Sequence, residues 1–442
     1  MLKLEGEAML FGCVADDLTG AVEIASMLVA QGVRTAFSIG PNVPQVQATD
    51  AHVVALKSRV APVAEAVSDV VAAASVLRRN GSKQLFFKYC ATFDSTPKGN
   101  IGPCAEALLD LVGSDFTIFA PSFCEVGRTV YQGHMFAGPQ LLSDSPKRFD
   151  PLTPMTDSNL LRVLDAQTTK KVGLLPHQAI HAGSQAVRRR IAELREDGTA
   201  FAIADAIYEA DLAVLARSCA DLPLLTGNSS IAAHLPRVWR EERLLQADTS
   251  VDPLPGISGN AAILVGSCAE RTAAQLAYFE QSHPVLRLDL ADAFAGEDLV
   301  KRAMAWAAQH IDNGPIAVST AADTAEVARL QDRHGRLEVA GRAEAILSDL
   351  ASALVERFQV RRLIVAGGET SGAVLNALGI DRLQIGPYEG PGIARVFAHD
   401  PKPMALLLKS GKLGSLDIFE AVLGAMQHAI RPEHRHATWL DA

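Results

Sequence analysis

Aromatic residues and long hydrophobic runs are scarce in this sequence. Aromatic side chains make up 5% of its 442 residues, and no apolar run approaches the roughly 20 residues that span a bilayer. The formal net charge is −9, which leaves no broad cationic field to attract nucleic acid or anionic lipid. We therefore expect a soluble, cytoplasmic protein whose partners include no nucleic acid and no membrane.

Paired cysteine motifs are also missing. The six cysteines include no C-x-x-C pair and no Cys/His spacing typical of zinc. In a chain of this length they predict reduced, mostly buried thiols. Disulfide-rich and zinc-finger classes are therefore excluded, and the ligands of any metal ion stay unknown at this stage.

The sequence does contain a regular alternation of short apolar strands and amphipathic helices. The expected strands cover residues 10–15, 33–39, 52–56, 84–88, 116–120, 171–174, 201–204, 222–226, 261–265, 285–290, 316–319, 363–366 and 404–409. This rhythm predicts α/β architecture, and the length favours more than one domain. We predict two α/β domains, each a mainly parallel sheet flanked by helices, with the active site in the cleft between them.

The expected domain boundary lies where charged residues give way to the segment Asp252-Pro253-Leu254-Pro255-Gly256. We expect a first domain over residues 1–236, a linker over 237–260 and a second domain over 261–442. The stretch 127–157 is rich in Gly, Pro, Asp and Thr, which predicts a long irregular segment of the kind that is often functional.

Two carboxylates follow the first strand, in the segment Asp16-Asp17-Leu18-Thr19-Gly20. Open α/β sheets bind ligands at the carboxyl ends of their strands. Adjacent carboxylates repel each other and need a partner such as a sugar hydroxyl, a lysine or Mg²⁺. The alternative is that one aspartate only caps the helix that follows.

A dense polar segment follows the strand at 84–88. Lys88 and Lys98 are suited to holding a carboxylate, and Asp94, Ser95 and Asn100 to holding hydroxyl groups. The alternative is an ordinary turn with a helix cap.

Small-residue turns follow three strands of the second half. They are Gly266-Ser267-Cys268, Gly367-Gly368-Glu369-Thr370-Ser371-Gly372 and Lys409-Ser410-Gly411. Glycines let backbone N–H groups approach an anion, and hydroxyl groups add donors. The second turn matches neither the P-loop nor the G-x-G-x-x-G pattern, and a turn that serves only packing is the alternative. Together the turns predict a nucleotide site.

At these residues the chain resembles the four-carbon acid sugar kinases, a family of ATP-dependent kinases for tetronates and related acids. The resemblance is carried in matching order by residues 15–20, 94–96, 99–102, 266–268, 367–372 and 409–411. Longer segments at 87–103, 127–134 and 151–159 are similar to the branch that acts on 3-oxo-tetronates.

The resemblance implies a sugar-acid-binding domain followed by a domain that binds ATP, with Mg²⁺ bridging phosphate oxygens. We expect Asp17, with Asp16 as the other candidate, to polarise the substrate hydroxyl. The expected substrate site comprises Asp16, Asp17, Lys88, Asp94, Ser95, Lys98 and Asn100. The expected nucleotide site comprises Ser267, Gly367, Gly368, Glu369, Thr370, Ser371 and Gly411, with Glu369 as a candidate to help hold Mg²⁺.

The implied reaction transfers the γ-phosphate of ATP to the C4 hydroxyl of a 3-oxo-tetronate and gives the 4-phosphate. The nearer alternative is a sister kinase acting on threonate or erythronate. The remoter ones are a nicotinamide-dependent sugar-acid dehydrogenase and a non-catalytic sensor. Asn228, Ser230, Lys412 and Leu413 depart from the family pattern and bear on nucleotide contacts and substrate identity. The sequence fixes neither stereochemistry nor oligomeric state, and a homodimer is compatible with it.

Overall fold

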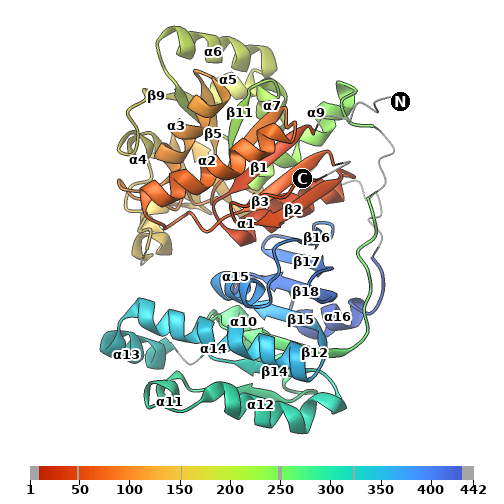
Figure 1. The fold of residues 1–442 in the computed structure, drawn as a ribbon. Helices are drawn as coiled ribbons and strands as arrows, with labels where there is room; N and C mark the ends of the chain where they lie inside the picture. Colours follow the sequence, from red (N-terminus) through yellow and green to blue (C-terminus); the bar gives the residue numbers. More distant parts are fainter. Residues whose placement is uncertain (1–8, 47–48, 151, 247–250, 322–323, 431–442) are drawn as a thin grey trace, which may run out of the picture. The chain divides into compact units, whose positions relative to one another are not determined.

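Buried apolar runs form the strands of two main sheets, one in each of two units of the chain (Figure 1). The computed structural model describes residues 9–46, 49–150, 152–246, 251–321 and 324–430. The division between the units falls between Val251 and Asp252. Residues 237–241, expected as the start of a linker, belong to helix α9 (Leu235–Glu241), because Val238 and Trp239 are buried in the first unit.

The main sheet of the first unit is entirely parallel, with the order β2-β3-β1-β4-β11-β5-β10-β9 among its described residues. Its strands are β1 (Phe11–Ala15), β2 (Thr35–Ile39), β3 (Ala51–Ala55), β4 (Gln84–Lys88), β5 (Thr117–Ala120), β9 (Val172–Leu175), β10 (Phe201–Ala204) and β11 (Leu224–Gly227). Every residue of β1 and β4 is buried, as expected for parallel strands covered on both faces.

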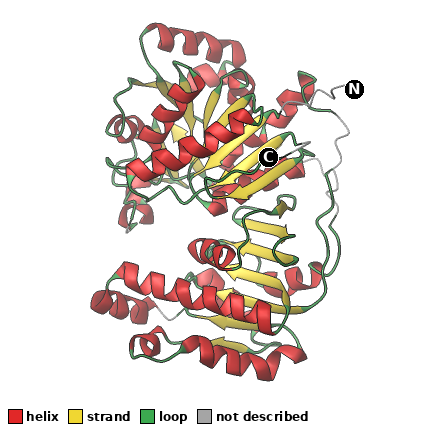
Figure 2. Ribbon diagram, viewed as in Figure 1, coloured by secondary structure: helices red, strands yellow, loops and turns green. Residues whose placement is uncertain are grey.

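Helices flank this sheet (Figure 2). They are α1 (Leu18–Ala30), α2 (Val63–Arg79), α3 (Ile101–Val112), α4 (Leu160–Asp165), α5 (His177–His181), α6 (Ser184–Glu196), α7 (Glu209–Cys219), α8 (Ser229–Ala233) and α9. In α2 the buried residues Ala66, Val70, Ala73, Ala74 and Leu77 recur every three or four positions. That spacing gives the helix one apolar face, which packs into the core beside β1 and β4.

A small antiparallel sheet occupies the stretch for which the sequence predicts an irregular segment. Its strands are β6 (Arg128–Tyr131), β7 (His134–Ala137) and β8 (Gln140–Leu141), with 3₁₀ turns at η1 (Cys124–Val126), η2 (Leu142–Asp144) and η3 (Pro146–Phe149). The β6–β7 turn has φ values of 49° at Gln132 and 71° at Gly133, as a two-residue hairpin of this kind requires. The irregular-segment prediction is therefore wrong for residues 128–141.

The second unit contains a mixed sheet with the order β13-β14-β12-β15-β18-β17-β16 in the part that the structure describes. The strands are β12 (Asn260–Val265), β13 (Val285–Arg287), β14 (Ile316–Ser319), β15 (Val360–Ala366), β16 (Gln384–Ile385), β17 (Ile393–Ala398) and β18 (Met404–Lys409). The neighbouring strands β13, β14, β12, β15 and β18 pair in parallel. Strand β17 pairs antiparallel with both β18 and β16. Two α/β units with mainly parallel, helix-flanked sheets confirm the predicted fold class.

The helices of the second unit are α10 (Glu270–Phe279), α11 (Leu290–Phe294), α12 (Leu299–His310), α13 (Thr324–His334), α14 (Arg336–Arg357), α15 (Gly368–Ala377) and α16 (Ile418–Ala425), with a 3₁₀ turn at η4 (Ile311–Asn313). Sequence analysis missed β16, which has only two residues, and β17, where Arg395 interrupts the apolar run.

Across the described residues, every helix is too short or too polar to traverse a bilayer.

Candidate functional site

Each main sheet reverses the direction of its strand order at one point. In the first unit the chain runs from β1 to the edge strand β2, returns to place β3 beside β1, and then continues on the other side of β1 with β4. In the second unit the same reversal lies between β12 and β15. Open α/β sheets bind ligands at the carboxyl ends of the strands beside such a reversal. The predicted polar turns follow β1 and β4 in one unit and β12 and β15 in the other.

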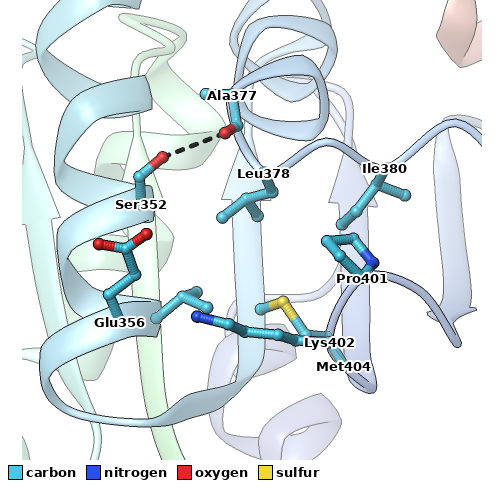
Figure 3. A pocket seen from close by; sticks show the side chains of 9 residues that line it. Ser352, Glu356, Ala377, Leu378, Ile380, Pro401, Lys402 and Met404 are labelled. Atoms are coloured by element: carbon cyan, nitrogen blue, oxygen red, sulfur yellow. Dashed lines mark hydrogen bonds between the residues drawn. The ribbon is translucent and has the colours of Figure 1, made fainter.

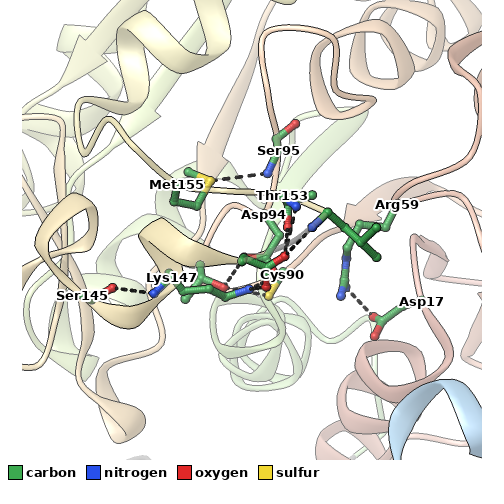
Figure 4. A network of polar contacts seen from close by, with 12 residues as sticks. Asp17, Arg59, Cys90, Asp94, Ser95, Ser145, Lys147, Thr153 and Met155 are labelled. Carbon is green, nitrogen blue, oxygen red and sulfur yellow. Dashed lines mark hydrogen bonds and ion pairs between the residues drawn. The ribbon is translucent and has the colours of Figure 1, made fainter. Parts of the chain in front are cut away.

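An arginine that sequence analysis missed, Arg59, joins the two aspartates after β1, and Figure 4 shows its contact with Asp17. Arg59 donates from Nε to Oδ2 of Asp16 at 2.9 Å and from Nη2 to Oδ1 of Asp16 at 2.8 Å. The same Nη2 lies 2.7 Å from Oδ1 of Asp17. The repulsion between adjacent carboxylates is thus offset by a shared guanidinium, which is the kind of partner that their spacing requires.

The two aspartates differ in what their oxygens still offer. Both carboxylate oxygens of Asp16 accept from Arg59, and its side chain is 5% exposed. Asp17 caps α1 by accepting from the Gly20 backbone N–H at 3.1 Å, and its side chain is 29% exposed. Asp17 therefore does cap α1, but the cap is not its only contact, because Arg59 also lies against it. In the described part of the chain, Oδ2 of Asp17 accepts no hydrogen bond.

The charges around Asp17 keep it ionised. Burial opposes its ionisation, but the positive charges of Arg59 and Lys88 outweigh burial and lower the pKa of Asp17 below its ordinary value. Asp16 shows the opposite balance, since burial raises the pKa of Asp16 although Arg59 acts against it. At neutral pH, Asp17 therefore offers a charged, partly exposed oxygen.

Lys88 is the buried cation of this cluster. It is 2% exposed, and its ammonium donates to the carbonyl oxygen of Tyr89 at 3.1 Å. Gly20 lies directly against it, because a Cβ added there would collide with both the Lys88 ammonium and Oδ1 of Asp17. Glycine at this position thus allows the carboxylate and the ammonium to approach the start of α1 together.

Asn100 is turned toward the protein rather than toward solvent. Its side-chain amide donates to the carbonyl oxygens of Ser58 at 2.6 Å, Arg59 at 3.3 Å and Ala61 at 2.9 Å. The backbone N–H groups of Ser58 and Arg59 in turn donate to the carbonyl oxygen of Asp16. Asn100 therefore fixes the segment that carries Arg59, and this contact is a different one from the hydroxyl contact that the sequence predicts.

A second ion-pair cluster follows β4. Lys147, on the segment after β8, lies 2.7 Å from Oδ2 of Asp94 and 3.1 Å from Oδ2 of Asp150 (Figure 4). The other oxygen of Asp94 accepts from Thr92 at 2.6 Å. Sequence analysis missed Lys147, because its partner stands 53 positions earlier in the chain.

Ser95 and Lys98 lie in contrasting places on the same polar segment. Ser95 is buried, and its hydroxyl accepts from Gln167 at 2.9 Å while its backbone N–H faces the sulfur of Met155 at 3.5 Å. The Lys98 side chain is exposed. The polar segment thus brings Lys88, Asp94, Ser95 and Asn100 into buried positions and leaves Lys98 at the surface.

The three small-residue turns of the second unit meet at one sheet edge. The backbone N–H groups of Gly266 and Ser267 donate to Ala366, and that of Gly367 donates to Lys409. A Cβ at Gly411 would collide with the Ser267 hydroxyl, and a Cβ at Gly266 with the Thr370 hydroxyl. Ser267, Gly367, Thr370 and Gly411 are therefore adjacent, as the predicted nucleotide site requires.

The start of α15 forms the rim of this edge. Gly367, with a φ of 134° that favours glycine, caps the helix, and its carbonyl oxygen accepts from the Ser371 hydroxyl at 2.8 Å. Gly368 and Glu369 are exposed, while Thr370 and Ser371 are buried. Exposed backbone at the first turn of a helix suits a phosphate.

Cavities of similar size lie at both ends of the strands in the described part of the second unit. One, of about 90 Å³, borders the turns and is lined by Ser267, Cys268, Arg287 and Ser319 among others. A larger one, of about 110 Å³, lies at the opposite ends of the strands, where Met404 begins β18 and Glu356 and Lys402 flank the opening (Figure 3). We place the candidate nucleotide site at the turns, because the donors gather there.

Two of the positions that depart from the family pattern lie at a helix start in the first unit. Asn228 caps α8 and accepts from the Ser230 backbone N–H at 3.2 Å. Lys412 is exposed directly after Gly411. The Asn228 side chain thus has a local structural role, and Lys412 places a further positive charge beside the third turn.

No cluster of three or more His, Cys, Asp or Glu side chains suited to a metal ion occurs in the described residues. The described side chains therefore do not form a metal site made by the protein alone. The residues of the turns do fit Mg²⁺ that arrives with a nucleotide, because this ion keeps most of its waters and needs only one or two carboxylates besides phosphate oxygens. Glu369, exposed at the start of α15, is a carboxylate within the second turn.

Comparison with known proteins assigns a domain family to each unit. Residues 11–235 match the sugar-binding N-terminal domain family, and residues 262–419 match the nucleotide-binding C-terminal domain family. These two matches define the class as proteins that pair a sugar-binding domain with a nucleotide-binding domain. The chain belongs to the four-carbon acid sugar kinase family, whose members are phosphotransferases with an alcohol group as acceptor.

Several relatives align along nearly their whole length. The chain is 47% identical to the 3-oxo-tetronate kinase of Burkholderia multivorans, over 95% of this chain and 98% of the relative. It is 39% identical to the 3-oxo-tetronate kinase of Salmonella typhimurium, over 92% of this chain and 97% of the relative. The 3-oxo-tetronate kinase of Escherichia coli is 40% identical over 86% of this chain and 98% of its own length.

Two solved structures share the fold. A crystal structure from Salmonella typhimurium has a TM-score of 0.83 and 37% identity, and the match covers 93% of this chain and 98% of that one. A crystal structure of a Haemophilus influenzae protein has a TM-score of 0.77 and 35% identity, covering 94% of this chain and all of the other.

Proposed function

We propose that this protein transfers the γ-phosphate of ATP to the C4 hydroxyl of a 3-oxo-tetronate, forming the 4-phosphate. The observation that carries the proposal is the difference in chemistry between the two strand reversals. One offers paired carboxylates beside a half-buried arginine and a buried lysine, and the other offers converging glycine and hydroxyl turns. The relatives named 3-oxo-tetronate kinase supply the substrate class. Direct transfer requires both ligands to meet during the reaction.

Asp17 is our candidate for the carboxylate that accepts a hydrogen bond from the substrate hydroxyl and then takes its proton. Its Oδ2 is uncommitted among the described residues, whereas both oxygens of Asp16 accept from Arg59. A carboxylate with a lowered pKa is a weak base. That suffices here, because phosphoryl transfer through a loose transition state depends mainly on orientation and charge neutralisation. Asp16 acts in this proposal by holding Arg59 beside Asp17.

The remaining candidate substrate residues supply charge and hydroxyl contacts. Lys88 or Lys98 forms an ion pair with the substrate carboxylate. Lys88 would do so from a buried position and Lys98 from the surface. Asp94 and Ser95 form hydrogen bonds with hydroxyl groups of the substrate. Asn100 contributes by fixing the Arg59 segment.

The nucleotide phosphates bind, in this proposal, to the turns that contain Ser267, Gly367, Gly368, Glu369, Thr370, Ser371 and Gly411. Mg²⁺ bound with ATP would neutralise charge on the phosphate oxygens, and Glu369 is the side chain suited to help hold it. The backbone N–H groups at the start of α15 and the Ser267 hydroxyl position the phosphates.

A coupled ADP-release assay with a panel of four-carbon acids tests this function. We expect turnover with a 3-oxo-tetronate and a product whose phosphorus signal is split by the two protons of a primary carbon. Preferred turnover of threonate or erythronate would establish the sister-kinase alternative instead. The family assignment gives the dehydrogenase alternative no support, and absence of ADP release with every acid would contradict the proposal.

A further inference from the structure

Lys409 is a buried lysine that connects the turns of the candidate nucleotide site. It ends β18 and is 1% exposed. Its ammonium donates to the carbonyl oxygen of Ser410 at 2.6 Å and to the hydroxyl of Thr272 at 3.2 Å. That hydroxyl donates in turn to the carbonyl oxygen of Gly411 at 2.6 Å. The backbone carbonyl of Lys409 accepts from Gly367 at 2.9 Å. One residue therefore holds two of the three turns.

The charge of this lysine has no counter-ion in the second unit as described. Over residues 252–321 and 324–430, no carboxylate forms an ion pair with Lys409. Its ammonium has three N–H donors and only two acceptors, both neutral. A buried cation is unfavourable unless it is paired, so this position favours an anionic ligand.

The surrounding charged groups do not supply that anion. On α10, Glu270 is exposed, and Arg271 adds a second positive charge that acts on Lys409. Glu369 on α15 and Lys412 after the third turn are exposed. On β17, Arg395 is paired with Glu389. Burial, with Arg271, lowers the pKa of Lys409 to about 8.

We propose that Lys409 is a positioning residue that fixes the Ser410–Gly411 turn and compensates the charge of the nucleotide triphosphate, so that nucleotide affinity follows the protonation of this one side chain. The inference rests on the proposed nucleotide site. A bound triphosphate favours the ammonium form, so binding above about pH 8 takes up a proton. ATP affinity then falls as the pH rises, whereas the affinity of uncharged adenosine does not.

Calorimetric titration with ATP and with adenosine at about pH 7 and about pH 9.5 tests the inference. We expect the Kd of the unmodified protein for ATP to rise about tenfold between these values and that for adenosine to stay constant. Lys409→Met should weaken ATP binding about tenfold or more at the lower pH and remove the pH dependence. Lys409→Arg should bind ATP well at both values, because arginine stays charged.

Lys402→Met is the matched control, since Lys402 precedes the opposite end of β18 and its loss should change neither the affinity nor its pH dependence. If Lys409→Met does not fold, the unmodified protein and Lys409→Arg still decide. Equal ATP affinity at both pH values, or an unchanged pH dependence in Lys409→Arg, overturns the inference while the nucleotide site stands. Failure of the unmodified protein to bind ATP overturns the proposed function itself.

Discussion

Asp16 and Asp17 are neighbours in the sequence, yet they occupy different chemical positions. Asp16 gives both oxygens to Arg59, while Asp17 caps α1 with one oxygen and keeps the other available. Sequence spacing could not separate them, because the difference comes from an arginine 43 positions later. At the scale of the residue, we therefore expect Asp17, and not Asp16, to contact the substrate hydroxyl.

Asp17→Asn should lower kcat by about 100-fold or more, since the amide cannot accept the hydroxyl proton and carries no charge. Steady-state assays with ATP and a 3-oxo-tetronate measure this. Asp110→Asn is the control, because the Asp110 side chain is 71% exposed and remote from the cluster in sequence. Turnover close to that of the unmodified enzyme in Asp17→Asn would remove Asp17 from the chemistry.

The charge state of Asp17 also predicts a pH profile. Because Arg59 and Lys88 lower the pKa of Asp17 despite burial, the carboxylate stays ionised until the pH falls below the ordinary aspartate value of 3.8. Activity that depends on it is then present above that value and lost below it. Arg59→Gln should raise the pKa of Asp17 and move the acid limb of kcat/KM to higher pH. An acid limb that does not move would show that Arg59 leaves Asp17 unaffected.

At the scale of the element, the first turn of α1 requires close packing. Gly20→Ala should destabilise the protein by about 1–3 kcal/mol and reduce activity, because the added Cβ meets the Lys88 ammonium and the Asp17 carboxylate. Gly341→Ala is the matched control inside helix α14, where nothing lies within 4 Å of the added carbon. That variant should be stabilised by about 0.5–1 kcal/mol. Thermal unfolding and kcat measure both, and equal behaviour of the two variants would contradict this packing.

The segment that carries Arg59 depends on Asn100. Asn100→Ala removes the donor to the carbonyl oxygens of Ser58, Arg59 and Ala61, which should destabilise the protein by about 1–3 kcal/mol. Because Arg59 would then be less well held, the acid limb of kcat/KM should shift in the same direction as in Arg59→Gln. A higher KM for the sugar acid, with unchanged stability and pH profile, would instead support a direct substrate contact.

Strand–turn–helix units were readily predicted from the sequence, because parallel strands such as β1 and β4 are continuous apolar runs. The partners of their polar ends were not. Arg59 follows β3 and meets Asp16 only because β3 pairs with β1, and strand order is not encoded in local periodicity. Lys147 was missed for the same reason. An arginine shortly after an expected strand end, at the same sheet edge as two carboxylates, was the available signal.

The second unit was predicted with similar success and a similar limit. Its three small-residue turns were found from their composition, and they meet because β12, β15 and β18 are adjacent in the sheet. The antiparallel pair β16 and β17 was missed, since one strand is too short and the other is interrupted by Arg395. The hydrogen bonds of Lys409 to Thr272 and Ser410 also depend on this tertiary arrangement.

At the scale of the whole molecule, the two units differ in the residues that follow their strands, and we assign the sugar acid to the first unit and the nucleotide to the second. The sugar-binding and nucleotide-binding domain families match the units separately, and the candidate residues of each ligand lie within one unit. Each ligand should therefore leave its own mark on the chain when it binds alone.

Hydrogen–deuterium exchange of the full-length protein, with a non-hydrolysable ATP analogue or with a 3-oxo-tetronate, measures where each ligand binds. We predict that the analogue slows exchange at residues 266–272, 367–372 and 409–415, and that the sugar acid slows exchange at residues 15–20, 57–61 and 88–100. If the ATP analogue instead slowed exchange in the first unit and left exchange at the turns of the second unit unchanged, the nucleotide would not bind where we place it.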